Sequence, residues 1–169
     1  DRNYLKDKLI SAFDTFGFQP IETPSFERSE MLLGKYGEEG DRLIFKILNS
    51  GEKINQADIK AFQSGNLLKF SNSLSQKALR YDLTVPFARY VAQNQNEIKF
   101  PFRRYQIQNV WRADRPQYGR FQEFLQCDAD VVGEPSLWQE VEGILLYDCV
   151  FSKLNLKGIN IKINHRKIL

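Results

Sequence analysis

The chain has 169 residues, of which 42% are hydrophobic and 27% charged, and it carries a formal net charge of +3. These values lie near the globular average and the length fits one domain, so they exclude disordered, collagen-like and coiled-coil chains. Two cysteines without a CxxC spacing and a single histidine exclude a disulfide scaffold and a Cys/His zinc cluster, and they indicate a reducing compartment.

The first half of the chain predicts short elements of both kinds. Apolar residues at helical spacing from Leu5 to Phe16 predict an opening helix that Gly17 ends. The next segments are expected as a strand at 18–22, a helix at 29–33, a Gly- and Glu-rich loop at 34–41 and a strand at 43–48. Residues 52–77 lack a clear pattern, so we expect a mobile insertion with one short helix.

The segment 78–84 alternates as a strand should, with Arg80, Asp82 and Thr84 sharing one face. Thr84 is expected to cap a helix that carries Pro86 in its first turn and runs to about Asn94. Two further strands are expected at 104–112 and 120–132, joined by the loop 113–119.

A long helix is expected after the second of these strands, opened by a capping box of Ser136 and Gln139. Its predicted apolar stripe consists of Leu137, Val141, Ile144, Leu145 and Leu154. The segment 159–163 predicts a last short strand. Because a chain that stops just after a strand leaves a sheet edge open, we expect this chain to be part of a longer protein.

Charge is distributed unevenly over the second half. Residues 99–120 contain six basic residues and one acid, whereas residues 121–150 contain seven acids and no Lys or Arg. Such neighbours can create a site that holds an anion beside a cation. Lys99, Arg103 and Arg104 also fit RNA phosphates, although a solvated strand edge explains them equally well.

The strand at 120–132 divides into two faces. One is apolar and consists of Phe121, Leu125, Cys127, Ala129 and Val131, so Cys127 is expected to be buried; the other consists of Arg120, Gln122, Phe124, Gln126, Asp128 and Asp130. A half-solvated sheet explains this pattern. However, Arg112 and Arg120 flank a loop longer than most hairpin turns, which favours a site with guanidiniums for phosphate and a ring for a base.

Other catalytic motifs are missing from the sequence. Neither GxGxxG nor GxxxxGK[ST] occurs, which excludes Rossmann and P-loop folds. His165 has no neighbouring residues that suggest a catalytic triad, and we expect a structural role for it. No apolar run approaches the roughly 18 residues that span a bilayer, and the N-terminus is unlike a signal peptide.

The block RRYQIQNVWRADRPQYGRFQEFLQCDADVVG resembles motif 2 of the class II aminoacyl-tRNA synthetases, in the form found in the histidyl-tRNA synthetase family. ALRYDLTVPFARY is similar to the first histidine-pocket segment of that family, GFQPIETPSFE to its motif 1 region with Pro24 at the motif's proline, and INHRKIL to a later segment. The resemblance implies an α+β fold with a mostly antiparallel sheet flanked by helices, of the class II catalytic-domain type. Residues 1–169 then correspond to a truncated catalytic domain with motifs 1 and 2, without motif 3 or the anticodon-binding domain.

The resemblance also implies roles for individual residues. Arg112 would be catalytic and contact both the ATP α-phosphate and the substrate carboxylate. Asp114 would lie near the adenine amino group, Arg120 would reach the phosphates and Phe124 would stack on adenine. The histidine substrate would be held by Asp82, Thr84, Arg112, Gln126 and Asp130. The family often has Glu at the positions of Asp82, Asp114 and Asp130, so their reach here is shorter by one methylene.

The function implied by the resemblance is ATP-dependent activation of L-histidine to histidyl-adenylate and its transfer to tRNA(His). ATP, Mg²⁺, a homodimer built through motif 1 and a cytoplasmic location belong to that expectation, and little activity is expected of this chain alone. The alternative is a non-catalytic paralogue that acts as the regulatory subunit of ATP phosphoribosyltransferase. Such a regulator has no need for Arg112, Arg120 and Phe124 together. An RNA-binding module that uses residues 99–120 is a third reading.

Overall fold

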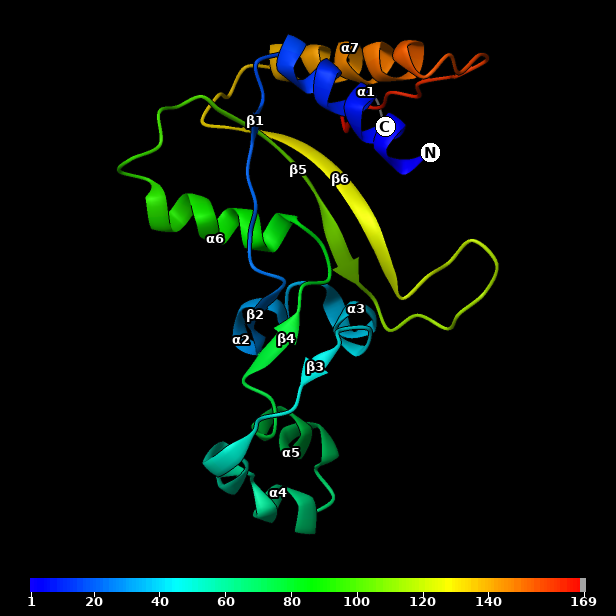
Figure 1. Cartoon of the computed structure of the whole chain (residues 1–169). Coiled ribbons are helices and arrows are strands. Elements are labelled where there is room, and N and C mark those ends of the chain that lie inside the picture. Colours follow the sequence, from blue (N-terminus) through cyan, green and yellow to red (C-terminus); the bar gives the residue numbers. More distant parts are fainter. Residues whose placement is uncertain (168–169) are drawn as a thin grey trace. The chain divides into compact units, whose positions relative to one another are not determined.

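A computed structural model describes residues 1–167 (Figure 1). Its elements are α1 (Arg2–Thr15), β1 (Gln19–Pro20), β2 (Phe26–Arg28), α2 (Ser29–Leu32), α3 (Gly37–Arg42), β3 (Lys46–Ile47), the 3-10 helix η1 (Gly51–Gln56), α4 (Ile59–Gln63), α5 (Leu67–Ser73), β4 (Lys77–Leu79), α6 (Thr84–Asn94), β5 (Phe102–Trp111), β6 (Glu123–Val132) and α7 (Trp138–Lys153). Two three-stranded sheets have the orders β1-β5-β6 and β2-β4-β3. The chain divides into two compact units, and β5 and β6 contribute residues to both.

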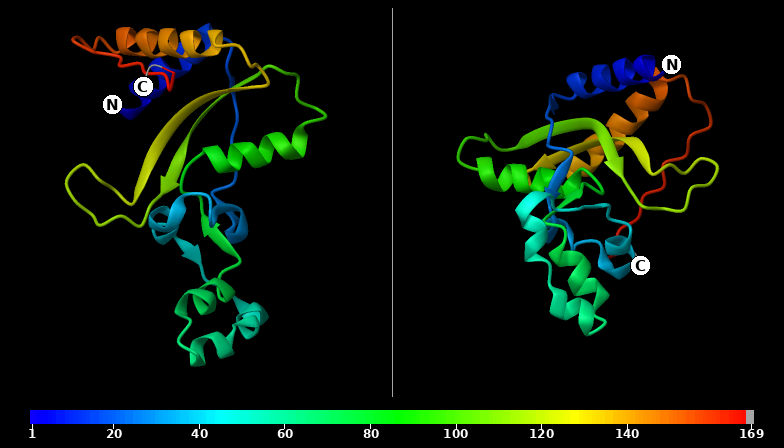
Figure 2. Two further views of the ribbon diagram at one scale, coloured as in Figure 1. Left: turned by 180° about the vertical axis from the view of Figure 1, so that it is seen from behind. Right: turned by 60° about the horizontal axis from the view of Figure 1, so that its bottom comes forward.

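The first unit comprises residues 1–21, 99–105 and the chain from 129 onward. In it β1 pairs in parallel with the start of β5, and α1 packs against α7 (Figure 2). The ring of Phe13 stacks on Tyr105 with the centroids 4.7 Å apart. Aromatic packing between helix and sheet therefore fixes α1 on this strand.

The second unit comprises residues 22–98 and 106–128. Its small sheet is antiparallel, with Phe26 opposite Leu79 and Lys46 opposite Ala78. Its core is formed by Leu32, Ile44 and Ala78, against which Leu33, Tyr36, Tyr81 and Val85 pack. The mixed helices and strands, with antiparallel pairing in this sheet, confirm the α+β expectation, while β1 pairs in parallel with β5.

Arg80 lies inside the second unit with an exposed fraction of 1%. Its Nε donates to the carbonyl of Asn109 at 2.8 Å, and its Nη1 donates to the carbonyls of Thr23 at 2.7 Å and Pro24 at 3.1 Å. Burial lowers the pKa of Arg80, while the charges of Glu22 and Glu27 oppose that shift. Because backbone carbonyls surround its guanidinium, Arg80 is not available to a phosphate, contrary to the face predicted from strand alternation.

Residues 51–73 form more structure than the sequence predicted. They contain η1, α4 and α5, and both α-helices begin with a side-chain cap: Asp58 accepts from the amide of Ala61 at 2.9 Å, and Asn66 from that of Lys69 at 3.1 Å. Asp58 also pairs with Lys69 at 3.0 Å. The expected single helix was therefore wrong, because caps placed by Asp and Asn are local signals that a search for apolar periodicity overlooks.

Several expected elements differ in extent. The expected loop at 34–41 contains α3, the strand expected at 43–48 is reduced to Lys46–Ile47, and the strand expected at 78–84 ends at Leu79. The cap of α6 was assigned to the wrong residue: Asp82 Oδ1 accepts from the amides of Thr84 at 3.1 Å and Val85 at 3.3 Å, and Thr84 is exposed. The carboxylate of Asp82, two residues before the helix, thus caps α6 in place of the Thr84 hydroxyl.

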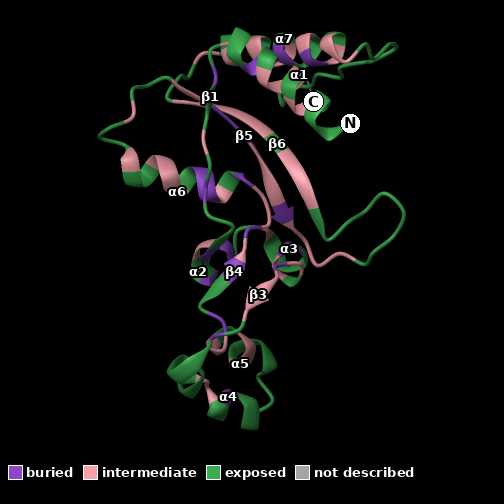
Figure 3. Ribbon diagram, in the orientation of Figure 1, coloured by how far each residue is buried: buried purple, intermediate pink, exposed green. Residues whose placement is uncertain are grey.

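The C-terminal part also corrects the sequence reading. Leu146 and Val150 are the buried residues of α7, whereas Leu137, Val141 and Leu145 of the predicted stripe are exposed (Figure 3). Ser136 Oγ accepts from the amide of Trp138 at 3.2 Å, but no donor reaches the buried Oε1 of Gln139, so only half of the capping box forms. Residues 159–163 form no strand in the described chain.

Cys127 and His165 both lie at the surface of the protein. Cys127 is exposed rather than buried, although Leu125, Ala129 and Val131 of the same predicted face are partly buried. His165 is exposed too, and its Nδ1 accepts from the amide of Lys167 at 3.1 Å, which is a local turn contact.

Candidate active site

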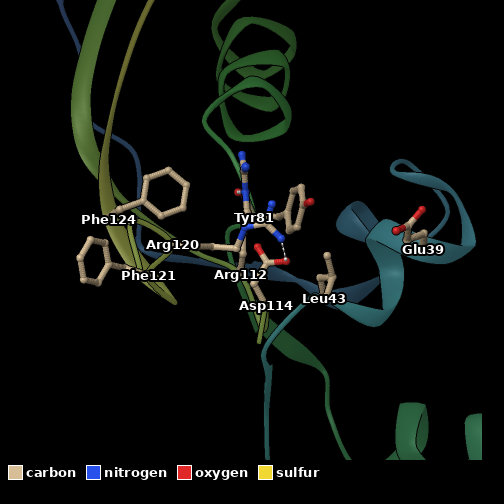
Figure 4. A pocket seen from close by; sticks show the side chains of 9 residues that line it. Glu39, Leu43, Tyr81, Arg112, Asp114, Arg120, Phe121 and Phe124 are labelled. Atoms are coloured by element: carbon tan, nitrogen blue, oxygen red, sulfur yellow. Dashed lines mark hydrogen bonds and ion pairs between the residues drawn. The ribbon is translucent and has the colours of Figure 1, made fainter. Parts of the chain in front are cut away.

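A cavity of about 500 Å³ lies in the second unit, where β5 ends and β6 begins. It is lined by Glu39, Leu43, Tyr81, Arg112, Asp114, Gly119, Arg120, Phe121 and Phe124 (Figure 4). All four residues expected to bind ATP are among them. The volume falls in the usual range for small-molecule sites, and the lining combines cations, carboxylates and rings, as a site for a charged aromatic ligand requires.

The loop between the two strands is closed at its base by backbone hydrogen bonds. The amide of Arg112 donates to the carbonyl of Gln122 at 2.9 Å, and the amide of Ala113 donates to the carbonyl of Leu43 at 2.8 Å. The backbone of Arg112, where the loop begins, is therefore held in place. The next residue is hydrogen-bonded to Leu43, in the segment that connects α3 to β3.

The guanidinium of Arg112 is held by two hydrogen bonds and lies between two aromatic rings. Its Nε donates to the carbonyl of Tyr81 at 3.1 Å and its Nη2 to Oε1 of Gln126 at 3.3 Å. Its Cζ lies 4.5 Å from the ring centre of Tyr81 and 5.1 Å from that of Phe124. No acceptor among the described residues contacts Nη1. The guanidinium is thus oriented by the protein while two of its N–H donors stay available to a ligand.

Asp114 and Arg120 face each other across the loop, with 3.8 Å between Oδ1 and Nη1. The Arg120 side chain is 57% exposed, so the pair contributes little to stability and the guanidinium is not committed to it. Gln122 Nε2 donates to the Asp114 carbonyl at 3.1 Å, which holds the acid at the start of the loop.

Only some of the residues expected to bind histidine lie at the cavity or next to it. Gln126 contacts Arg112, and its Nε2 donates to both carboxylate oxygens of Asp128, at 3.1 and 2.9 Å. Asp82 directly follows the cavity residue Tyr81 and is half-buried, while Thr84 contributes only its amide to Asp82.

Asp130 belongs to the other unit. Its Oδ2 lies 2.5 Å from Nη2 of Arg104, whose side chain is completely buried. Asp130 is thus the ion-pair partner of a buried cation within the first unit. The histidine-binding role expected for Asp130 stays a prediction.

Five of the residues that line the cavity were not expected there from the sequence, and neither was the neighbouring Tyr36; the five are Glu39, Leu43, Tyr81, Gly119 and Phe121. Tyr81 lies in the segment 78–84 that was expected as a strand, and Tyr36 and Glu39 lie in the expected Gly- and Glu-rich loop at 34–41. Tyr81 could have been recognised from its place beside Asp82 in the segment that resembles a histidine pocket. Tyr36 and Glu39 carried no such signal, because they reach the site only through the fold of 34–43 around α3.

Metal ligands are sparse in the part of the chain that the structure describes. No group of three or more His, Cys, Asp or Glu residues gathers in residues 1–167 to hold an ion. Glu39 and Asp114 are the carboxylates at the cavity, which does not make a protein-built cage for Mg²⁺. Within the same residues, no helix has the length and apolar character needed to cross a bilayer.

The fold is that of the class II aminoacyl-tRNA synthetase catalytic domain. A histidyl-tRNA synthetase structure from Nostoc sp. superposes with a TM-score of 0.68 at 31% identity, covering 91% of this chain and 30% of that one. A pyrrolysyl-tRNA synthetase from Desulfitobacterium hafniense matches with a TM-score of 0.67 at 16% identity, covering 92% of this chain and 46% of that one. The low identity of the second match supports the fold alone.

Sequence comparison specifies the family. The histidyl-tRNA synthetase family profile matches residues 55–169. The histidine–tRNA ligase of Christiangramia forsetii is 68% identical over 99% of this chain and 37% of its own length, and that of Flavobacterium johnsoniae is 61% identical over 99% of this chain and 39% of its own length. The chain therefore belongs to the histidyl-tRNA synthetase family, and it spans somewhat more than a third of the curated relatives it matches.

Proposed function

We propose that the complete protein containing this chain is a histidine–tRNA ligase. In the first step, the carboxylate of histidine attacks the α-phosphate of ATP, which gives histidyl-adenylate and releases pyrophosphate. In the second step, the aminoacyl group passes to a terminal hydroxyl of tRNA(His) and AMP leaves. Because this reaction serves translation, we place the protein in the cytoplasm.

The observation that carries the proposal is the clamped guanidinium of Arg112 with its unused Nη1 donors. The first step brings a carboxylate onto an anionic phosphate, and negative charge grows at phosphorus in the transition state. A planar, fixed guanidinium can bridge both anions at once, which a flexible ammonium does less well. Such preorganised donors contribute most when they are oriented before the reaction begins.

The neighbouring residues fit the remaining parts of ATP and histidine. The Arg120 guanidinium is exposed at the cavity and would bind the phosphates, and the ring of Phe124 would stack on adenine with Asp114 near its amino group. Asp82, Thr84, Gln126 and Asp130 remain the candidates for histidine. Mg²⁺ would neutralise phosphate charge and arrive with ATP, since the described residues form no cage for it.

Amino-acid-dependent exchange of pyrophosphate into ATP tests the proposal directly. We expect exchange with histidine and none with the other amino acids in the complete gene product, and charging of tRNA(His) in a second assay. The chain of residues 1–169 alone is expected to give little or no exchange.

The same experiment addresses the regulatory alternative. The structure of an ATP phosphoribosyltransferase regulatory subunit/histidyl-tRNA synthetase from Bacillus halodurans matches with a TM-score of 0.67 at 22% identity, covering 89% of this chain and 33% of that one, so it shares the fold. Histidine binding without exchange would assign the protein to that class. Sedimentation of the complete protein would test the homodimer expected through the motif 1 region.

A further inference from the structure

Tyr36 contacts the candidate histidine site from outside the motifs that resemble the family's pocket. It directly precedes α3, and its hydroxyl donates to Oδ1 of Asp82 at 2.8 Å. Its ring packs on that of Tyr81, with the centroids 4.7 Å apart and the planes at 45°. One side chain thus touches both the acid expected to bind histidine and the ring beneath Arg112.

The two oxygens of Asp82 have different surroundings. Oδ1 accepts three hydrogen bonds, from the Tyr36 hydroxyl at 2.8 Å and from the amides of Thr84 at 3.1 Å and Val85 at 3.3 Å. No donor in residues 1–167 contacts Oδ2. The protein therefore fixes the carboxylate through one oxygen and leaves the other to an external ligand, and Tyr36 supplies the only side-chain donor of the three.

Gly40 is what allows Tyr36 to take this position. It is buried in α3, and a Cβ added there would lie 2.5 Å from Cβ of Tyr36. That distance is shorter than real side chains tolerate, and the clash is with the rigid base of the tyrosine side chain rather than its flexible end. The helix and the tyrosine are thus fitted to each other.

The Tyr36 hydroxyl also keeps its proton well above neutral pH. Burial, and then the charge of Asp82, raise the pKa of Tyr36 far above its usual value. The proton consequently remains on Tyr36, and the hydrogen bond to Asp82 does not titrate in the neutral range.

We propose that Tyr36 is a positioning residue for the amino-acid substrate: it holds Asp82 so that Oδ2 binds the cationic amino group of histidine, and it supports Tyr81 beneath Arg112. This inference rests on the proposed function. It gives the segment around α3, which lies outside the motif 1 and motif 2 blocks, an indirect part in binding the amino acid through Asp82.

The test is Tyr36→Phe in the complete gene product, with Tyr4→Phe as the matched control, since Tyr4 is half-exposed on α1. A hydrogen bond to a charged group is lost, so we expect KM for histidine in pyrophosphate exchange to rise about 10-fold. KM for ATP should change less than twofold, and the thermal midpoint should stay within a degree or two of that of the control. Gly40→Ala, which displaces the tyrosine without removing its hydroxyl, should give the same selective rise.

An unchanged KM for histidine in Tyr36→Phe would overturn the inference. So would equal losses for histidine and ATP together with a lower midpoint, because those indicate a general structural role. If the wild type shows no exchange at all, the proposed function fails instead, and calorimetric titration of histidine into the same proteins still decides on Tyr36: about 10-fold weaker binding in the variant supports the inference, whereas equal or absent binding overturns it.

Discussion

Two arginines of the second unit, Arg80 and Arg112, show how differently one side chain can be used. Arg80 is 1% exposed, and its guanidinium already donates to backbone carbonyls of the protein, those of Thr23, Pro24 and Asn109. Arg112 is only half-buried; it donates to one carbonyl and one amide and lies between two rings. Both are rigid, but only the second keeps donors for a ligand.

The difference teaches that a fixed guanidinium becomes a binding group only where it has unused donors. The two side chains touch the same strand pair, since Arg80 binds the Asn109 carbonyl of β5 and Arg112 directly follows that strand. Substitution of the first should therefore reduce stability, and substitution of the second should reduce activity.

The largest effect is expected for Arg112→Lys. Lysine keeps the charge but loses the planar fork, so it cannot bridge two anions. Loss of one preorganised donor costs about 2.7–4 kcal/mol of transition-state stabilisation, which corresponds to a roughly 100- to 1,000-fold slower histidine-dependent exchange. Arg115→Lys, at an exposed loop position, is the control and should keep wild-type exchange. Exchange within tenfold of the wild type would contradict the role of Arg112.

Arg80→Met should act on stability instead. The thioether has a similar length but no N–H, so the carbonyls of Thr23, Pro24 and Asn109 lose the guanidinium donor, and of these the Thr23 carbonyl keeps a hydrogen bond from Gln108 Nε2 at 3.4 Å. Each buried acceptor left without a partner costs about 1–3 kcal/mol, and we expect a decrease of roughly 3 kcal/mol in the free energy of unfolding measured in urea.

The control for Arg80→Met is Arg28→Met, because the Arg28 side chain is 74% exposed. KM values for ATP and histidine should stay unchanged in the folded fraction of the Arg80 variant. A stable variant with impaired exchange would show that the two arginines are not separated as described.

Thr23→Val should also reduce stability, but by less than Arg80→Met. Valine keeps the shape, but Oγ1 no longer accepts from Gln106 Nε2 at 2.8 Å and Arg80 Nη1 at 3.3 Å. The backbone carbonyl of residue 23 still binds Arg80, so we expect about 1–2 kcal/mol lower stability in urea unfolding. Thr15→Val, at an exposed position of α1, should cost clearly less. Equal losses of stability at both positions would contradict a stabilising role for the buried hydrogen bonds of Thr23 Oγ1.

The smallest effect is expected for Phe124→Leu. The substitution removes one of the two rings that contact the Arg112 guanidinium. A ring–cation contact contributes about 0.5–1 kcal/mol, so KM for ATP should rise about 2- to 5-fold, and further if the ring also stacks on adenine. Phe26→Leu also removes a ring beneath a cation, that of Lys77, away from the cavity. It should leave KM for ATP unchanged; an equal rise would contradict the role of Phe124.

Much of the site could be anticipated from the sequence because its residues lie in one contiguous block. Arg112, Asp114, Arg120 and Phe124 are close in the chain, and two paired strands with a loop between them necessarily bring them together. The end of α1 shortly before Gly17 and the end of α6 at Asn94 could be predicted for a similar reason, since helix ends depend on local signals in the chain.

The remainder depended on tertiary contacts that no local pattern encodes. Strand alternation placed Arg80 beside Asp82 and Thr84, but the strand ends at Leu79 and the guanidinium turns into the interior. The apolar stripe of α7 was wrong because the face that packs is decided by α1, which lies far away in the sequence. Tyr36 lies at the site because it directly precedes α3, and the Gly- and Glu-rich sequence of that segment did not predict a helix.

Asn49 joins the two ends of the helical segment at 51–73. The amide of Asn49 donates to the carbonyl of Leu74 at 2.8 Å, and its Oδ1 accepts from the amide of Gln76 at 3.0 Å. The entropy of closing a loop depends only weakly on its length once the ends are joined. This closure makes the segment an appendage whose size can vary with little consequence for the pairing of β3 with β4, and it gives natural variation or an engineered insertion a place to lengthen the chain.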